Sequence, residues 1–141
     1  MIKDFFTAKD IAIAGASRNP AKFGNMLCKE LISRGHTVYP VNPSGESICG
    51  LKTYEDISSL PDTISHLIII TRKDRSEALV RDAIRKGITH IWIQQQSDTP
   101  SAIDSAEKAG ITVTYGKCAF MYLEPVTGIH NFHKKVKKLF C

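Results

Sequence analysis

The sequence IAIAGASRNPAKFGN, residues 11–25, places a short apolar strand directly before a glycine-bearing turn and then a helix. Gly15 has no Cβ atom, so the backbone can turn sharply where the strand ends. The helix that follows directs its unpaired N–H groups and the positive end of its dipole at the space above the turn. This order is typical of a phosphate site, although a strand-turn-helix unit whose glycines serve packing alone has the same pattern.

The glycines of this turn depart from the dinucleotide fingerprint G-x-G-x-x-G. Ser17 stands where the second glycine belongs, and Gly24 comes later than the third. At the end of the second expected strand, a dinucleotide site has an Asp or Glu for the ribose hydroxyls, whereas this sequence has Asn42 between Pro40 and Pro43. Asn does not repel an additional phosphate, and the prolines can offer a flat apolar surface to a purine. A nucleotide with an extra phosphate therefore fits better than NAD.

Length and composition are ordinary for one globular domain, because the 141 residues are 43% hydrophobic and 23% charged. We therefore expect a single domain over residues 1–141. No apolar run approaches the roughly 20 residues of a transmembrane helix, and the N-terminus lacks the apolar centre of a signal peptide. These features predict a cytoplasmic protein without membrane contact.

The net charge of +5 suits either nucleic acid or an anionic small ligand. Lysines at 134, 135, 137 and 138 form a basic tail, and the other cations spread along expected helices, which makes nucleic acid the less favoured partner. The four cysteines and five histidines show neither a C-x-x-C pair nor the spacing of a metal site. Reduced thiols and no structural metal are expected.

Apolar runs alternate with stretches of helical spacing through most of the chain. Asp74 with Glu77 predicts a capping box for one helix, and Thr99 with Pro100 predicts the start of the next. The irregular stretch that follows the second strand predicts only a short edge strand at residues 51–53 and one helical turn at 54–60. The main strands are predicted at residues 11–14, 36–41, 66–71, 89–93 and 111–115, with a lead-in helix within residues 1–9.

Repeated β-α-β units make this an α/β fold, namely a three-layer, Rossmann-like, doubly wound parallel sheet. We expect the main strand order 2-1-3-4-5 plus the short edge strand. Because this order switches direction between the first and third strands, the loops at residues 15–24 and 71–73 should form the two sides of one crevice.

Two motifs are the most specific in the chain: the G-A-S turn with its late glycine, and the P-V-N-P run at residues 40–43. Together with GLKTYEDISSLPD, HLIIITR and IWIQQQ, and with GITVTYGKC after them, they give residues 9–121 a resemblance to the small CoA-binding domain family. That family is similar in fold to the N-terminal domain of the succinyl-CoA synthetase α subunit. The resemblance implies coenzyme A, or an acyl-CoA, as the ligand.

The resemblance also implies which residues meet each part of the ligand. The phosphates would be surrounded by Gly15, Ser17, Arg18, Asn19 and Gly24, with Ala16, Phe23 and Asn25 completing this cofactor-binding segment. The adenosine end would meet Val41, Asn42 and Pro43, and the pantetheine would pass Thr71, Arg72 and Gln94. Lys22 and Lys52, together with Arg18, are candidate partners of the 3′-phosphate. Gly24 is expected to lie where the helix start approaches the ligand too closely for a side chain.

No catalytic centre is evident in the sequence. The phosphorylated histidine of the synthetase belongs to a second domain without a counterpart here, so the resemblance does not carry ligase activity over. His130 and His133 match no catalytic motif. Cys118, after the last strand, is interpreted as a buried thiol rather than an acyl acceptor.

Two other functions stay open: an NAD(P)-binding enzyme or redox sensor on the same fold, and a partner-binding module that acts through the basic tail. Residues 128–141 predict a helix with an apolar stripe and lysines opposite it. Such a helix usually packs on its own domain or on a second subunit, which leaves a homodimer or a partner protein open.

Overall fold

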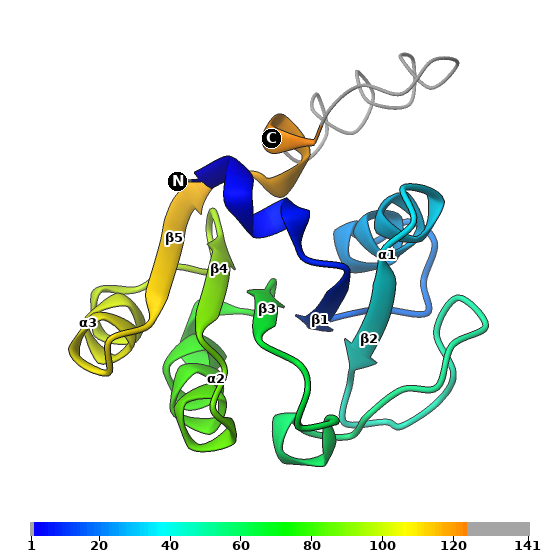
Figure 1. The fold of residues 1–141 in the computed structure, drawn as a ribbon. Coiled ribbons are helices and arrows are strands. Elements are labelled where there is room, and N and C mark those ends of the chain that lie inside the picture. The colour runs from blue at the N-terminus through cyan, green and yellow to red at the C-terminus, as the bar shows by residue number, and fades with distance from the viewer. Residues whose placement is uncertain (1, 124–141) are drawn as a thin grey trace.

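A five-stranded parallel sheet forms the centre of the computed structural model, which describes residues 2–123 (Figure 1). The strand order is β2-β1-β3-β4-β5, as the alternation of elements predicts. The strands are β1 (Asp10–Ala14), β2 (Thr37–Val41), β3 (His66–Ile69), β4 (His90–Gln94) and β5 (Thr112–Lys117).

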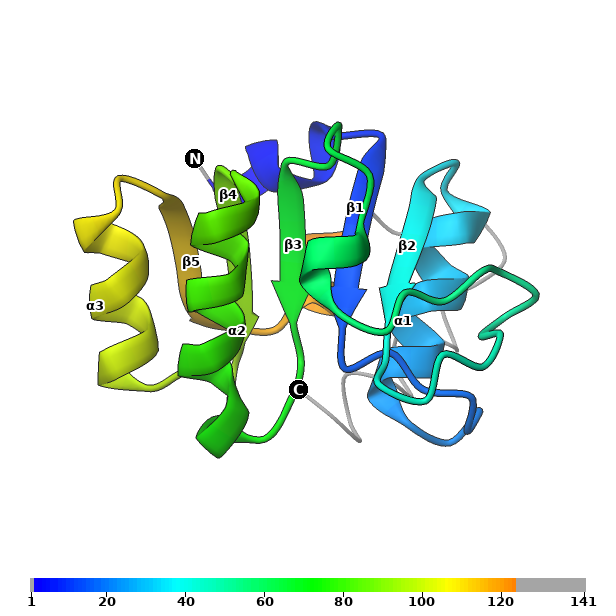
Figure 2. The same ribbon diagram turned by 90° about the horizontal axis from the view of Figure 1, so that it is seen from below.

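Helices cover both faces of this sheet (Figures 1 and 2). One face carries α1 (Phe23–Ser33) with the 3-10 helices η1 (Ile2–Thr7) and η3 (Ala119–Tyr122). The other face carries α2 (Lys73–Lys86), α3 (Pro100–Lys108) and the 3-10 helix η2 (Ile57–Ser59). The helices that follow β1 and β3 therefore lie on opposite faces.

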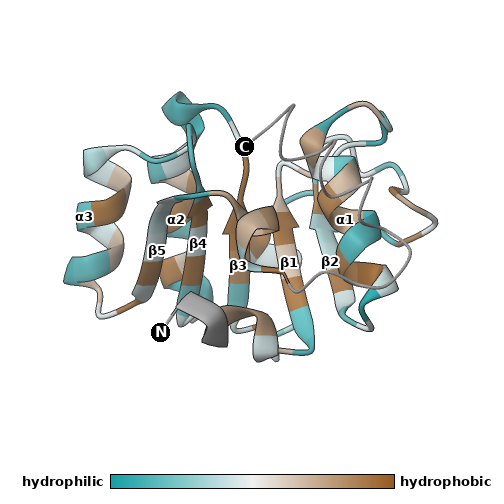
Figure 3. Cartoon of the chain, turned by 90° about the horizontal axis from the view of Figure 1, so that it is seen from above, coloured by the Kyte–Doolittle hydropathy of each residue, from teal (hydrophilic) through white to brown (hydrophobic). Residues whose placement is uncertain are grey.

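The central strand is buried on both faces, because successive side chains of a strand point to opposite sides. Ile11 and Ile13 pack on the α1 side, whereas Ala12 and Ala14 face the α2 side. All four are at most 1% exposed. Figure 3 shows the same arrangement as apolar strands between the two helical layers.

The predicted edge strand at residues 51–53 is not formed. Instead, Tyr54 makes a single parallel bridge with Val41, and its N–H and C=O bond Pro40 O and Asn42 N at 2.9 Å each. Cys49 and Gly50 both have positive φ, 52° and 73°, so the chain reverses there in a tight turn. This turn leaves no extended run beside β2.

The predicted capping box of α2 is also wrong. Arg72 is the N-cap residue, without a side-chain capping hydrogen bond. Asp74 pairs with Arg72 at 3.5 Å, and Glu77 pairs with Arg81 at 2.7 Å, so both expected capping carboxylates are engaged in ion pairs.

The start of α3 follows the prediction, since Thr99 Oγ1 accepts a hydrogen bond from Ala102 N–H at 3.1 Å and Pro100 is the first helical residue. Within residues 2–123, no helix combines the length and apolarity that a membrane span requires. The predicted helix at 128–141, with His130 and His133, lies outside the described residues.

Candidate functional site

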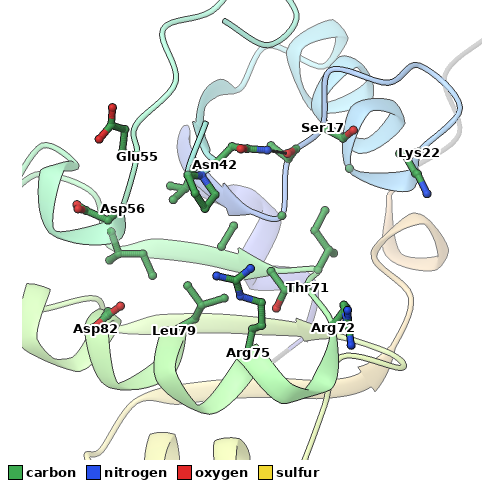
Figure 4. Close-up of a pocket in the computed structure, with 18 of the residues that line it drawn as sticks. Ser17, Lys22, Asn42, Glu55, Asp56, Thr71, Arg72, Arg75, Leu79 and Asp82 are labelled. Carbon is green, nitrogen blue, oxygen red and sulfur yellow. Dashed lines mark hydrogen bonds between the residues drawn. The ribbon is translucent and has the colours of Figure 1, made fainter. Parts of the chain in front are cut away.

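A cavity of about 660 Å³, here called the crevice, lies at the carboxyl ends of β1, β2 and β3 (Figure 4). It is at the topological switch point, where the sequence predicts a crevice. Three segments line it. They contribute Ala14, Gly15, Ala16, Ser17, Lys22, Phe23 and Gly24; then Val41, Asn42, Pro43, Glu55, Asp56 and Ile57; and finally Ile70, Thr71, Arg72, Arg75, Leu79 and Asp82.

The turn after β1 is closely packed against the loop after β3. Gly15 has φ +98°, and a Cβ atom there would lie 2.7 Å from Ile70 O, so only glycine fits. Local hydrogen bonds shape the rest of the turn: Asn19 N–H donates to Ser17 Oγ at 3.1 Å, and Ala21 N–H donates to Asn19 Oδ1 at 2.9 Å.

Gly24 is required by a contact within the protein. A Cβ atom at Gly24 would overlap Gly15 O and would lie 3.2 Å from Ala16 Cα. The first turn of α1 therefore rests directly on the turn after β1. This packing accounts for the glycine by itself; the expectation that Gly24 lies close to a ligand stays a prediction, and Gly24 does line the crevice.

The N-terminus of α1 carries no anionic group of its own. Its N-cap residue is Lys22, which makes no side-chain capping hydrogen bond, and the first turn contains no acidic residue. The positive end of the helix dipole is therefore not balanced by a carboxylate of its own first turn.

Asn42 joins the end of β2 to the turn after β1. Its Nδ2 donates to Ala16 O at 2.8 Å, and its Oδ1 accepts from Ser44 N–H at 2.9 Å. An aspartate cannot make the first of these bonds. The amide in place of the dinucleotide-binding acid is therefore a structural requirement of this turn.

Two cations predicted for the 3′-phosphate do not line the crevice. Arg18 forms an ion pair with Glu46. The Lys52 ammonium lies 5.0 Å from the centre of the Tyr54 ring. Of the three predicted cations, Lys22 alone lines the crevice.

Three amide side chains predicted for the site also lie outside its lining. Asn19 shapes the turn, as described above. Asn25 is buried, and its Nδ2 donates to Ser17 O at 2.9 Å. Gln94 is buried too, and its Oε1 accepts from Ala119 N–H at 2.9 Å, so it holds the start of η3.

Sequence reasoning missed eight lining residues: Ala14, Glu55, Asp56, Ile57, Ile70, Arg75, Leu79 and Asp82. Helical spacing could have found those on α2, because residues 72, 75, 79 and 82 fall on one stripe of a helix. Residues 55–57 carry no such signal, since their position depends on the isolated Tyr54 bridge.

Hydrogen bonds fix the position of the Asp56 carboxylate on the acidic side of the crevice. Asp56 Oδ1 accepts hydrogen bonds from Ser58 Oγ at 2.7 Å and from Ser59 N–H at 2.9 Å. These bonds hold the pKa of Asp56 below its ordinary value, so this carboxyl is ionised at neutral pH.

Two buried serines fix the α2 side of the crevice. Ser76 Oγ donates to Ser97 O at 2.5 Å, and Ser97 Oγ donates to Thr71 O at 2.6 Å. The hydroxyl of Thr71 itself is buried and has no hydrogen-bond partner among the described residues.

Cys118 is buried and disulfide-bonded, which corrects the expectation of reduced thiols at this position. Cys28 and Cys49 are free, and burial, followed by the nearby Cys49, raises the pKa of Cys28 to about 12. Among residues 2–123, no three His, Cys, Asp or Glu side chains gather as a metal site.

Comparisons with known proteins agree with this fold. The family described as CoA binding domain matches residues 9–124. The alpha subunit of an ADP-forming acetate–CoA ligase II from Pyrococcus furiosus is 26% identical, over 99% of this chain and 31% of that subunit. The solved structure of a conserved hypothetical protein from Pyrococcus furiosus is 33% identical, with TM-score 0.76, over 79% of this chain and 96% of that one.

A longer solved structure matches as well. The dinucleotide-forming acetyl-coenzyme A synthetase 1 of Ca. Korarchaeum cryptofilum, in complex with phosphate and ADP, is 25% identical with TM-score 0.71. The match covers 82% of this chain and 27% of the synthetase. The chain spans only 11% to 31% of the length of four ADP-forming acetate–CoA ligase chains that it matches. With the family match over residues 9–124 and the five-stranded parallel sheet, the chain belongs to the CoA-binding domain family.

Proposed function

We propose that the crevice binds coenzyme A or an acyl-CoA, without a chemical step of its own. The phosphates lie at the Gly15–Ala16–Ser17 turn and the N-terminus of α1, and the adenosine end lies against Val41, Asn42 and Pro43. The pantetheine arm leaves past Thr71 and Arg72.

The observation that carries this proposal is the α1 N-terminus, which has neither a capping side chain nor a first-turn acid and which opens on a cavity of about 660 Å³. Lys22, Arg72 and Arg75 add positive charge to the lining. A cavity of this size falls within the range of small-molecule sites, roughly 300–1,000 Å³. Glu55, Asp56 and Asp82 also line the crevice, so its positive charge is confined to the parts formed by Lys22 with the α1 N-terminus and by Arg72 with Arg75. These parts favour the phosphates of a ligand, and the size of the cavity favours a ligand of considerable length.

The buried Thr71 hydroxyl supports the route of the pantetheine arm. Leaving a buried hydroxyl without a partner costs free energy. The amides of a pantetheine arm that passes Thr71 and Arg72 can supply the missing hydrogen bond.

The NAD(P) alternative is less well supported. Ser17 replaces the glycine of the dinucleotide fingerprint, and the Asn42 amide is engaged by Ala16 O and Ser44 N–H. The end of β2 therefore presents no carboxylate to a ribose.

Calorimetric titration with CoA, dephospho-CoA, NAD and NADP at one salt concentration tests the proposal. We expect CoA to bind most tightly and NAD most weakly. Tighter binding of NAD or NADP than of CoA would give first place to the redox alternative. Failure of all four to bind would leave the partner-binding alternative, which pull-down with the intact chain then tests.

A further inference from the structure

Arg75 differs from every other arginine of the chain in its partners. The sequence has six arginines, all within the described residues. Five of them form ion pairs, namely Arg18–Glu46, Arg34–Glu30, Arg72–Asp74, Arg81–Glu77 and Arg85–Asp82. Arg75 has no carboxylate partner among residues 2–123.

Helical spacing explains the pairing of the other arginines within α2. Side chains three or four residues apart are neighbours on a helix. Glu77 and Asp82 stand at these distances before Arg81 and Arg85, with N···O distances of 2.7 and 2.8 Å. The charges of these two arginines are therefore balanced within the helix.

Arg75 has no anionic neighbour of this kind. The residues three before it and three and four after it are Arg72, Ala78 and Leu79. Figure 4 shows the Arg75 side chain rising from α2 into the crevice, beside Leu79 and Thr71. Among the arginines of α2, the one without a carboxylate partner is thus the one that lines the cavity.

The surroundings of Arg75 increase the local positive potential. Arg75 lies in the first turn of α2, where a cation opposes the helix dipole. Lys22 and the N-terminus of α1 lie on the opposite side of the same crevice, and Arg72 lies one turn from Arg75. The lining carboxylates Glu55, Asp56 and Asp82 oppose this potential, but none of them is paired with Arg75, and Asp82 is paired with Arg85. An anion at the Arg75 guanidinium would therefore relieve the repulsion among the cations.

We propose that Arg75 binds a phosphate group in the nucleotide half of CoA; this inference rests on the proposed function. A guanidinium offers a planar pair of N–H donors that matches phosphate oxygens. Arg75 thereby supplies a phosphate-binding cation within the crevice, whereas Arg18 and Lys52 lie outside its lining and contact Glu46 and the Tyr54 ring. The 3′-phosphate and the diphosphate are the two sources of this chemistry.

Calorimetric titration of the parent, Arg75→Gln and Arg81→Gln tests the inference. Arg81 is the matched control, because it is exposed on the same helix and paired with Glu77. We expect Arg75→Gln to bind CoA at least about tenfold more weakly, since a charge-assisted hydrogen bond is lost, and Arg81→Gln to bind like the parent. Equal urea midpoints of the three proteins show that the fold is retained.

Dephospho-CoA separates the two phosphate sources, and either result supports the inference. If Arg75→Gln weakens CoA but not dephospho-CoA, Arg75 binds the 3′-phosphate; if both ligands weaken equally, it binds the diphosphate. An Arg75→Gln variant that binds CoA as tightly as the parent overturns the inference.

The test also distinguishes a failure of the proposed function. If the parent does not bind CoA, the same proteins are titrated with adenosine 3′,5′-bisphosphate and with inorganic pyrophosphate. Weaker binding of either anion to Arg75→Gln alone retains Arg75 as an anion-binding residue in a site for another ligand. Equal binding to all three proteins, or binding to none, rejects it.

Discussion

Asn42 shows how a single side chain can set both the shape and the chemistry of the crevice. Its amide is a donor to Ala16 O and an acceptor from Ser44 N–H. In Asn42→Asp, the carbonyl of Ala16 would lose its donor and face a carboxylate. We expect this variant to lose about 1–3 kcal/mol of unfolding free energy, measured by urea denaturation at neutral pH.

Asn19→Asp is the matched control for this change, because Asn19 uses its side-chain oxygen to accept from Ala21 N–H. An aspartate keeps that acceptor, so we expect a change within about 0.5 kcal/mol. Equal losses in the two variants would show that added charge, rather than the lost donor, is responsible.

Gly24 gives a second prediction at this scale. A Cβ atom in Gly24→Ala would overlap Gly15 O, so the start of α1 and the turn after β1 must move apart. We expect a loss of about 1–3 kcal/mol in unfolding free energy, together with weaker CoA binding.

Gly35→Ala is the comparison for Gly24→Ala. Gly35 has φ +91° and open space around its Cβ position, so alanine there strains the backbone but leaves the crevice intact. It should lower stability while CoA affinity stays unchanged. Unchanged CoA affinity in Gly24→Ala would contradict the expected displacement of the turn.

Several residues of the site could be predicted from the sequence because they belong to one local motif. The turn at Gly15 and the strand end at Asn42 are of this kind. Arg18 and Lys52 do not line the crevice, and the sequence contains no sign of this, since their partners Glu46 and Tyr54 lie in an irregular loop whose path no periodic pattern predicts.

At the scale of elements, β3 and β4 begin with a pair of histidines. His66 and His90 are partners in the sheet register, and their rings stack with centroids 4.2 Å apart. Burial, and then the charge of His90, lower the pKa of His66 from its ordinary value of 6.5. Ser65 Oγ lies 2.7 Å from His66 Nδ1, and Phe5 packs against the ring.

The pH dependence of stability follows from this pair. The folded state binds a proton at His66 less readily than the unfolded state does. Neutral His66 therefore makes its full contribution to the unfolding free energy above about pH 6.5, and this contribution is lost as the pH falls below that value. We expect the unfolding free energy to decrease between pH 7.5 and pH 5.5, and to decrease less in His66→Gln. The same slope in the variant and the parent would exclude the histidine pair as the cause.

The strands and helices were largely predictable, because apolar runs and helical spacing report burial directly. The capping box predicted for α2 is not formed, since the helix already begins at Lys73 with Arg72 as its N-cap residue, which places Asp74 inside the first turn. Arg75 and Leu79 lie on a stripe that was visible in the sequence, but only the fold shows that this stripe faces the crevice.

At the scale of the whole molecule, the crevice joins helices from opposite faces of the sheet (Figure 2). A ligand that contacts both α1 and α2 is bound only by the folded protein and therefore stabilises it. We expect CoA at about 100 times its Kd to add roughly 2.7 kcal/mol of unfolding free energy. Scanning calorimetry at increasing CoA concentration measures this as a rising Tm.

Arg81→Gln should show the same rise in Tm as the parent, and Arg75→Gln a smaller rise at equal CoA concentration. A Tm that does not respond to CoA, in a protein to which CoA binds by calorimetric titration, would mean that the ligand also binds the unfolded chain.

The hydrogen bonds from Ser76 to Ser97 and from Ser97 to Thr71 make the two sides of the crevice unequal in rigidity before any ligand binds. They tie the loops after β3 and β4 to α2, so this side loses little conformational entropy on binding. Residues 18–22, on the opposite side, are exposed. The hydrogen bonds of this turn, from Asn19 N–H to Ser17 Oγ and from Ala21 N–H to Asn19 Oδ1, are exposed to water, whereas those of the α2 side are buried or partly buried. We therefore expect association to cost this turn more conformational entropy, and substitutions that stiffen it to lower the rate of CoA release in stopped-flow measurements.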